Sequence, residues 1–275
     1  MLGKLIKYDL KSTSRILVII HVFLILSALF MRFLITGRVE EDLFMASGGS
    51  DVFYTLLVMV YTLVIIGASF ATCMVIAIRF YRHLFSDEGY LTNTLPVKRS
   101  THLLAKTISG SLWLCIDMIL IMLSLFLVAF PPVVLEMFRE NQETVARFFG
   151  FGAGSLPSLP AFLGLFLLVC VLSGISSVVT LYGSIALGQL FSEHRVIGAV
   201  ACYFAITTIT SVISYIAMAI LGISGNYLAV ADGTVLNLGE FLWKLILFSL
   251  VWSLILSVIL YVVTTWVMNR KLNLP

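Results

Sequence analysis

Six long apolar runs, separated by shorter polar segments, set the pattern of the chain. Each has about the 20 residues that a helix needs to cross the hydrocarbon core of a bilayer. The runs are continuously apolar and do not alternate with a period of two, which is typical of spanning helices and not of a membrane β-barrel. They cover Ile16–Ile35, Val52–Ile78, Ile108–Phe130, Ala161–Leu187, Val196–Leu221 and Leu242–Met268. The pattern predicts an all-α integral membrane protein with six transmembrane helices in a single domain, 1–275.

Composition supports a membrane protein and excludes an ordinary soluble domain. The chain is 60% hydrophobic and only 11% charged, with a mean hydropathy of +1.09, whereas soluble domains are about 25% charged. The 17 Lys and Arg residues divide unevenly: twelve fall in the N-terminal arm, the segment 79–106, the loop after the fourth run and the C-terminus. Because loops rich in Lys and Arg stay in the cytoplasm, we expect both termini to be cytoplasmic. The net charge of +3 reflects this asymmetry and indicates no nucleic-acid partner.

The N-terminal arm has an amphipathic pattern. One helical face gathers its apolar side chains and the flank gathers its lysines, namely Leu2, Leu5, Ile6 and Leu10 against Lys4, Lys7 and Lys11. Lysines can reach lipid head groups while leucines are buried. The pattern favours an elbow helix over 1–15 that lies in the membrane interface; the alternative is a disordered basic tail.

The segment 79–106 is the longest polar interval in the first half of the chain. No helix breaker follows the second run, so we expect its helix to continue past Tyr81. Gly89 permits a tight turn or a close backbone approach. Pro96 ends the preceding helix, and Ser100 is a candidate N-cap of the next one.

This segment resembles the coupling-helix region of ABC-2 type permeases, the membrane subunits of ABC exporters. The residues that carry the resemblance run from Asp87 to Arg99 (DEGYLTNTLPVKR), followed by LLAK ending at Lys106. Tyr90 and Thr92 depart from the family pattern, in which threonine and a second acid are common. The stretch Ser184–Arg195 is similar to the same place in Gram-positive members of the family.

The resemblance implies the type V exporter fold, in a bacterial cell membrane. A separate ABC ATPase would bind ATP and Mg²⁺ and dock on the coupling helix, and a second permease subunit would complete a homodimer or heterodimer. The implied docking residues are Asp87, Glu88, Gly89, Tyr90, Leu91 and Thr94, with a secondary cytoplasmic contact at Gln189, His194 and Arg195. The cargo expected is an amphiphilic peptide, a lipid or a drug.

Sequence motifs for chemistry within the chain itself are missing. It contains no GxxxxGK[ST] phosphate loop, no HExxH and no GxSxG, so we expect neither an enzyme nor a cofactor or metal site in this chain. Its four histidines are scattered, and its four cysteines fall inside the apolar runs without CxxC spacing, as packing residues do. A lipid enzyme would have to use His83, Asp87, Glu88 and His102, whose spacing fits no metal or hydrolase pattern.

Asp117 is the only acid well inside an apolar run. A carboxylate in lipid must face a partner or water, so it marks a cation or proton site or pairs with a polar neighbour. His21 and Arg32, near the two ends of the first run, are interpreted as interfacial. Because Asp117 could mark a cation or proton site, a secondary transporter driven by an ion gradient is the alternative function.

Overall fold

Six α-helices make up almost all of the part of the chain that the structure describes. The computed structural model describes residues 2–42, 50–86, 89, 98–129, 140, 159–191, 194–223 and 238–270. The helices are α1 (Leu2–Asp42), α2 (Ser50–Phe85), α4 (Arg99–Ala129), α7 (Leu159–Gly188), α8 (Arg195–Ile220) and α9 (Leu238–Arg270). All six are long and apolar enough to cross a membrane. The prediction of an all-helical chain with six helices long and apolar enough to span a membrane is confirmed for the described residues.

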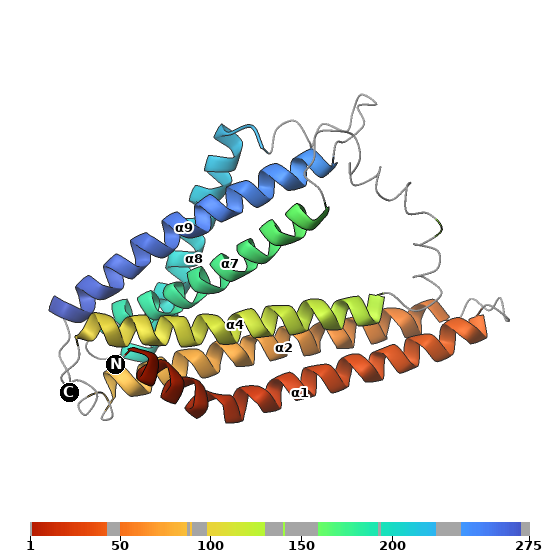
Figure 1. Ribbon diagram of the computed structural model, residues 1–275, viewed down its shortest axis with the longest axis horizontal. Helices are drawn as coiled ribbons and strands as arrows, with labels where there is room; N and C mark the ends of the chain where they lie inside the picture. Colours follow the sequence, from red (N-terminus) through yellow and green to blue (C-terminus); the bar gives the residue numbers. More distant parts are fainter. Residues whose placement is uncertain are drawn as a thin grey trace.

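The helices form two groups of three. In the first group α1 packs against both α2 and α4, and in the second α7 packs against both α8 and α9. The groups meet through α4 and α7 at the end of the molecule where α1 begins and α9 ends, and they diverge toward the other end (Figure 1). We call the meeting end the closed end.

The hydrophobic core lies at the closed end and joins the two groups. Phe80 of α2 stacks on Tyr182 of α7, with ring centroids 3.7 Å apart and an interplanar angle of 9°. Buried residues from five helices surround this pair, namely Leu17, Ile76, Leu84, Phe85, Leu103, Trp113, Leu114, Val178, Ile185, Ala186, Val267 and Met268. A second, small cluster of Ala28, Met31 and Tyr61 packs α1 against α2 farther along. The two groups are therefore fastened together mainly at one end.

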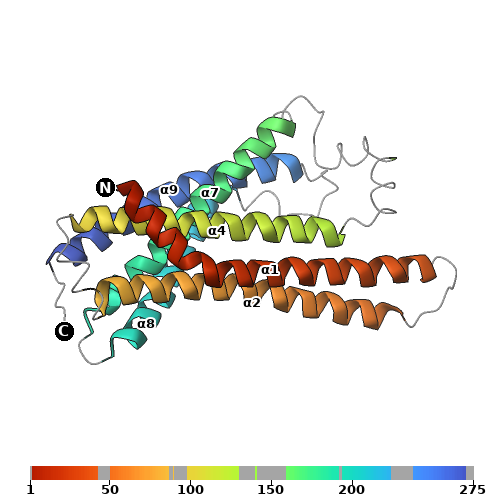
Figure 2. The same ribbon diagram turned by 60° about the horizontal axis from the view of Figure 1, so that its bottom comes forward.

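α1 is a single helix of 41 residues, about 60 Å long at 1.5 Å per residue. The helix does not break at residue 15, but its first turns lean away from the rest (Figure 2). Thr13 and Ser14 donate hydrogen bonds to the carbonyls of Asp9 and Lys11, an arrangement that often bends helices. The predicted lysine flank is exposed and the leucine face is partly buried. The position of this arm in the membrane interface stays a prediction.

The helices next to the segment 79–106 also extend beyond their apolar runs. α2 continues past Tyr81 to Phe85, as expected. α4 begins at Arg99, so Ser100 lies within its first turn and the predicted N-cap is wrong. Arg99, the first residue of α4, donates from Nη1 to the carbonyl oxygen of Met268, 2.8 Å away in the last turn of α9. This bond also satisfies a carbonyl that the end of α9 would otherwise leave unpaired.

Glycines shape both ends of α8. A Cβ at Gly188 would overlap the backbone of Ala199, and a Cβ at Gly198 would come within 2.7 Å of the Phe191 ring. These two glycines allow α7 and α8 to approach closely at their turn. At the other end Gly222 has a φ of +68°, and its N–H donates to Ala219 while that of Ile223 donates to Met218, which is a Schellman motif.

Candidate functional site

A buried carboxylate from α4 meets polar side chains from α1 and α2 inside the first helix group. Asp117 Oδ1 lies 3.1 Å from His21 Nε2 and 3.2 Å from the Thr72 hydroxyl. Asp117 is 1% exposed, His21 5% and Thr72 0%. Asp117 lies about 27 Å along α4 from Arg99 and about 18 Å from Ala129, at 1.5 Å per residue. We call these three residues the Asp117 triad.

The local helix geometry positions the triad. Trp113 precedes Asp117 by four residues, so the two lie on one face of α4. Its ring stacks on His21, with centroids 6.0 Å apart at an interplanar angle of 22°. The Thr72 hydroxyl also lies 3.1 Å from the carbonyl oxygen of Ala68, so its single hydrogen is shared between this carbonyl and the carboxylate or serves one of them at a time.

The Asp117 triad bears on two predictions. His21 is buried and lies near the middle of α1 (Leu2–Asp42), in contact with Asp117, and its position relative to a membrane interface stays a prediction. Pairing with a polar neighbour, one of the two alternatives for Asp117, is present in the structure, and a cation or proton site there stays a prediction. Arg32 does lie toward the far end, where Nη1 donates to the carbonyl oxygen of Leu127 at 2.7 Å.

A second ionic cluster lies nearer the closed end. Lys106 Nζ is 2.9 Å from Asp9 Oδ1, and the Ser109 hydroxyl donates to Asp9 Oδ2. The side chains of Lys106 and Asp9 are only 9% and 15% exposed. Tyr182 of α7 donates to the backbone carbonyl of Lys106, 3.2 Å away. This Asp9 cluster (Asp9, Lys106, Ser109) connects the leaning start of α1 to α4. In the sequence, the feature that could have indicated such a contact is Asp9, a single acid within the basic N-terminal arm.

Hydroxyl groups line a cavity in the second helix group. The cavity has a volume of about 450 Å³ and lies between α7, α8 and α9. Its hydroxyl residues are Ser173, Ser176, Ser177, Thr210, Ser211, Ser214, Tyr215, Ser249 and Ser253. Phe248 and Trp252, which stack at 6.0 Å, also line it, and no charged residue is among its described lining. The sequence carried a signal for this hydroxyl cavity in serines that recur three or four positions apart.

Most residues of the predicted docking surface lie outside the described residues: Asp87, Glu88, Tyr90, Leu91 and Thr94. Gly89 is described, and its N–H donates to the Ser86 carbonyl at 2.7 Å. A Cβ at Gly89 would lie 2.6 Å from the carbonyl oxygen of Leu84. Glycine is therefore required here by the close backbone approach that the sequence predicted.

The predicted secondary contact lies at the closed end, between α7 and α8. Gln189 follows the last residue of α7, and its side-chain Nε2 donates to the Ile185 carbonyl at 3.3 Å. His194 precedes α8, and its backbone carbonyl accepts a hydrogen bond from the Gly198 N–H at 2.8 Å, while Arg195 is the first residue of the helix. The turn between α7 and α8 lies at the same end of the molecule as the end of α2 and the start of α4 (Figure 1).

Two of the residues considered for a lipid enzyme, His83 and His102, share one cavity of about 400 Å³ with Asp9 and Lys106. Asp9, the carboxylate described there, is already engaged by Lys106 and Ser109. Among the described residues no group of three or more His, Cys, Asp or Glu could hold a metal ion. All four cysteines are free and partly buried.

The site and fold define a class of protein: a helical protein with six helices long and apolar enough to span a membrane, and with ionisable side chains paired between them. In comparisons with known proteins, no family model, no curated protein and no solved structure matched the chain.

Proposed function

We propose that the chain is the membrane-spanning subunit of an ATP-driven exporter of the ABC-2 type, coupled to a separate ATPase. The observation that carries this proposal is the arrangement of the closed end. α2 and α4 extend beyond their apolar runs on either side of the segment 87–97, and the α7–α8 turn, the start of α1 and the end of α9 lie at the same end. A docking partner at this end would reach both helix groups.

The contacts at the closed end could transmit a movement of the docking segment 87–97 to both helix groups. Phe80, Leu84 and Phe85 are buried in the last turns of α2, and Phe80 stacks on Tyr182 of α7. On the other side of the segment Arg99 binds the carbonyl of Met268 in α9. Because a partner shifts an equilibrium only by binding one state better than the other, the ATPase would have to hold Asp87–Thr94 differently with and without ATP.

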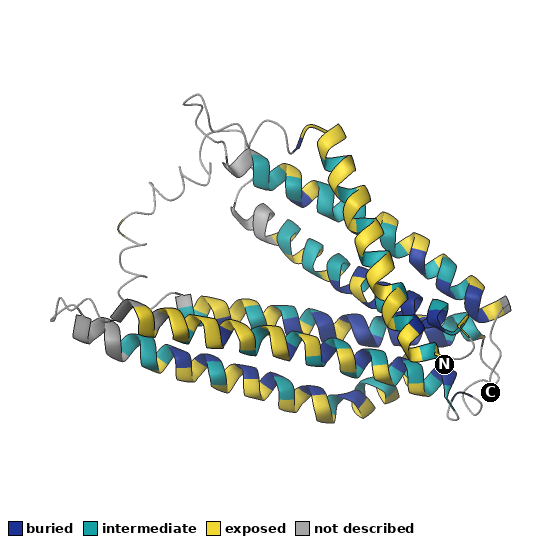
Figure 3. Cartoon of the chain, turned by 180° about the vertical axis from the view of Figure 1, so that it is seen from behind, coloured by how far each residue is buried: buried dark blue, intermediate teal, exposed yellow. Residues whose placement is uncertain are grey.

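The sequence and the surface of the molecule support the remaining parts of the proposal. The chain has no phosphate loop of its own, so ATP and Mg²⁺ belong to the partner. α8 leaves most of its apolar surface exposed (Figure 3), and Gly198 is its one buried residue. A second permease subunit, identical or homologous, would cover part of such surface. The uncharged hydroxyl cavity suits the polar part of an amphiphilic peptide, lipid or drug.

The test is purification of the tagged chain in detergent from its native cell, with ATPase activity measured on the eluate. We expect an ABC ATPase to copurify. Glu88→Lys and Leu91→Asp should abolish its recovery or uncouple its activity from cargo, because both changes fall in the predicted docking segment. Glu140→Lys is the matched control: it makes the same charge reversal at an exposed position in the polar segment between α4 and α7, outside the docking segment.

Two results would contradict the proposal. One is a chain that purifies alone from cells whose ABC ATPases are well expressed. The other is equal loss of ATPase from Glu140→Lys and Glu88→Lys, since the docking segment would then have no special role.

A second candidate, a secondary transporter driven by an ion gradient, is favoured by the Asp117 triad. Intramembrane carboxylates and histidines are typical of proton pathways. In liposomes that contain only this chain, an imposed pH gradient would then drive cargo uptake, and Asp117→Asn would abolish it while Ser27→Ala, on the exposed side of α1, would not. Transport that requires both ATP and the ATPase would exclude this candidate.

A further inference from the structure

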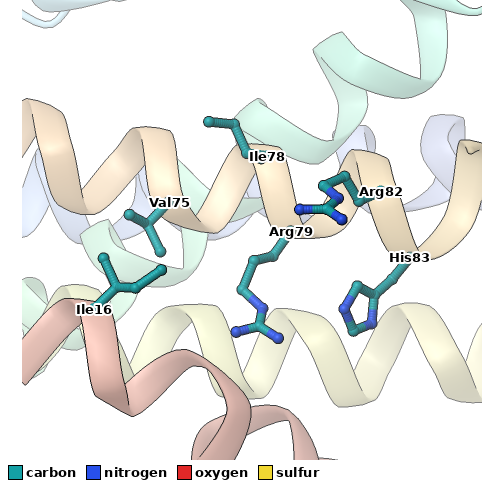
Figure 4. Close-up of a pocket in the computed structure, with 6 residues that line it drawn as sticks. All are labelled: Ile16, Val75, Ile78, Arg79, Arg82 and His83. Carbon is teal, nitrogen blue, oxygen red and sulfur yellow. The ribbon is translucent and has the colours of Figure 1, made fainter. Parts of the chain in front are cut away.

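A basic cavity opens beside the end of the apolar part of α2, and neither proposed function uses it. The cavity has a volume of about 310 Å³ and is lined by Ile16 of α1 and by Val75, Ile78, Arg79, Arg82 and His83 of α2. Figure 4 shows Arg79 and His83 extending from the same side of α2, with Arg82 between them along the helix. Small-molecule sites commonly have volumes from about 300 Å³ upward.

The polar half of the cavity is positive. Arg79, Arg82 and His83 have the i, i+3, i+4 spacing that places side chains on one helix face. Among the described residues that line the cavity, none is a carboxylate. The neighbouring acid Asp9 is bound by Lys106 and Ser109, and His83 also lies near enough to interact electrostatically with that carboxyl group. Guanidinium groups form strong, charge-assisted hydrogen bonds with phosphate, so the chemistry of this half selects a phosphate-bearing anion.

Arg79 is held in position for such a ligand. Its Nη2 donates to the Ser12 hydroxyl of α1, which fixes the side chain between the two helices. Its Nε is buried and has no hydrogen-bond partner within the part of the chain that the structure describes. Burial of an unpaired donor is costly, and this cost falls when an acceptor binds.

The apolar half of the cavity faces lipid. Ile16 is 51% exposed and Ile78 is 49% exposed, and in a membrane-spanning chain such apolar surface contacts acyl chains. Ile78 is also the last residue of the apolar run of α2, with Arg79 directly after it. The change from hydrocarbon-like to cationic lining therefore coincides with the boundary between the acyl chains and the head groups.

From this arrangement we propose that the cavity binds an anionic phospholipid of the surrounding membrane. Its phosphate would lie at Arg79 and Arg82, and the part of its acyl chain nearest the head group would lie against Ile16 and Ile78. A soluble phosphate compound shares the head-group chemistry but would gain nothing from the apolar half. Basic pockets between spanning helices are the usual places where proteins recognise anionic head groups. The proposal does not depend on the transport mechanism.

The test measures lipid binding to the full chain in detergent by native mass spectrometry and by the shift in its thermal unfolding. The probes are phosphatidylglycerol, phosphatidylcholine and free glycerol phosphate. We expect phosphatidylglycerol to bind and to raise the unfolding temperature more than the other two. In the double variant Arg79→Gln/Arg82→Gln its apparent affinity should fall about tenfold or more, because two charge-assisted hydrogen bonds are lost.

The matched control is Lys4→Gln/Lys7→Gln, which removes two exposed positive charges at the same end of the molecule but outside the cavity. Its affinity for phosphatidylglycerol should stay close to that of the wild type. Equal losses in the two double variants would mean diffuse attraction to the basic arm and would overturn the proposal. Glycerol phosphate that competes as well as the lipid would also overturn it.

Two single variants keep the test decisive if the arginine pair is needed for folding. Arg82→Gln leaves the contact between Arg79 and Ser12 intact and should still weaken phosphatidylglycerol binding. Ile16→Glu places a carboxylate against the expected acyl chain and should weaken binding further, because a charged group in contact with hydrocarbon is costly. Unchanged binding in both would overturn the proposal.

Discussion

The two helix groups are held together by different kinds of contact. In the group of α1, α2 and α4, polar contacts between buried or nearly buried side chains link the helices: a hydrogen-bonded imidazole–carboxyl pair at His21–Asp117 and an ion pair at Asp9–Lys106. In the other group α7 carries both of its neighbours and contains no charged residue. Its contacts with α8 and α9 use glycines, such as Gly188 against Ala199 and Gly183 near Thr264.

This difference bears on which group can move. A slide by one helical turn, about 5.4 Å, in the first group would separate buried charged partners, and an uncompensated buried charge costs about 3–5 kcal/mol. The described contacts within the second group are close packing at small residues and separate no charged pair when they slide, so this group is freer to shift. We infer that α1, α2 and α4 form the fixed part, and that α8 and α9 rearrange around α7.

The largest effect is expected from Asp117→Ala, which leaves His21 buried without its partner. The free energy of unfolding in detergent should fall by about 3–5 kcal/mol. Asp117→Asn keeps the shape and one hydrogen bond and should cost about 1–3 kcal/mol. A combined His21→Leu/Asp117→Leu variant should recover much of the loss; if it were as unstable as Asp117→Ala, the pair would not be the source of the effect.

Lys106→Met should come next, because it removes the ammonium group from Asp9 but leaves the Ser109 hydroxyl in place. We expect a loss of about 2 kcal/mol, the typical value for a hydrogen bond to a charged group. Protection of the α1 amides from hydrogen exchange should fall near Asp9 and Thr13. A loss confined to α7–α9 would contradict the assignment of this cluster to the first group.

Gly188→Ala should disturb the second group without removing any polar contact. The new methyl would overlap the Ala199 backbone, and the shift it forces should cost about 1–3 kcal/mol. Gly164→Ala is the matched control on the same helix: nothing lies within 4 Å of its added Cβ, so it should be neutral or slightly stabilising. Equal effects on thermal unfolding would show that α7 and α8 are not in close contact at Gly188.

The smallest effect on stability is expected from Ser176→Ala combined with Ser211→Ala in the hydroxyl cavity. Neither hydroxyl makes a hydrogen bond to another described residue, whereas Ser184 donates to the Thr180 carbonyl at 2.7 Å. Unfolding should change by less than about 0.6 kcal/mol, while cargo-stimulated activity should fall. A large loss of stability would make the serines structural packing residues.

The sequence was sufficient for the features that depend on one stretch of chain. Continuous apolar runs predicted the six spanning helices, and Gly89 was predicted to allow a close backbone approach, which Leu84 supplies. Contacts between distant stretches were not predictable, because apolar runs do not specify which faces meet. His21 and Asp117 are 96 residues apart, and their pairing depends on which faces of α1 and α4 meet. Ser100 was misjudged for a related reason, since Arg99 is held by α9.

The bond from Arg99 to Met268 has a mechanical consequence. It joins the first turn of α4 to the last turn of α9, so the two helix groups share a rigid joint next to the segment 87–97. α9 extends far from that joint, so a small rotation of α9 there becomes a much larger displacement at its distant end. The closed end therefore acts as a pivot, and for a given rotation there the displacement at the far end of a helix increases with the length of the helix.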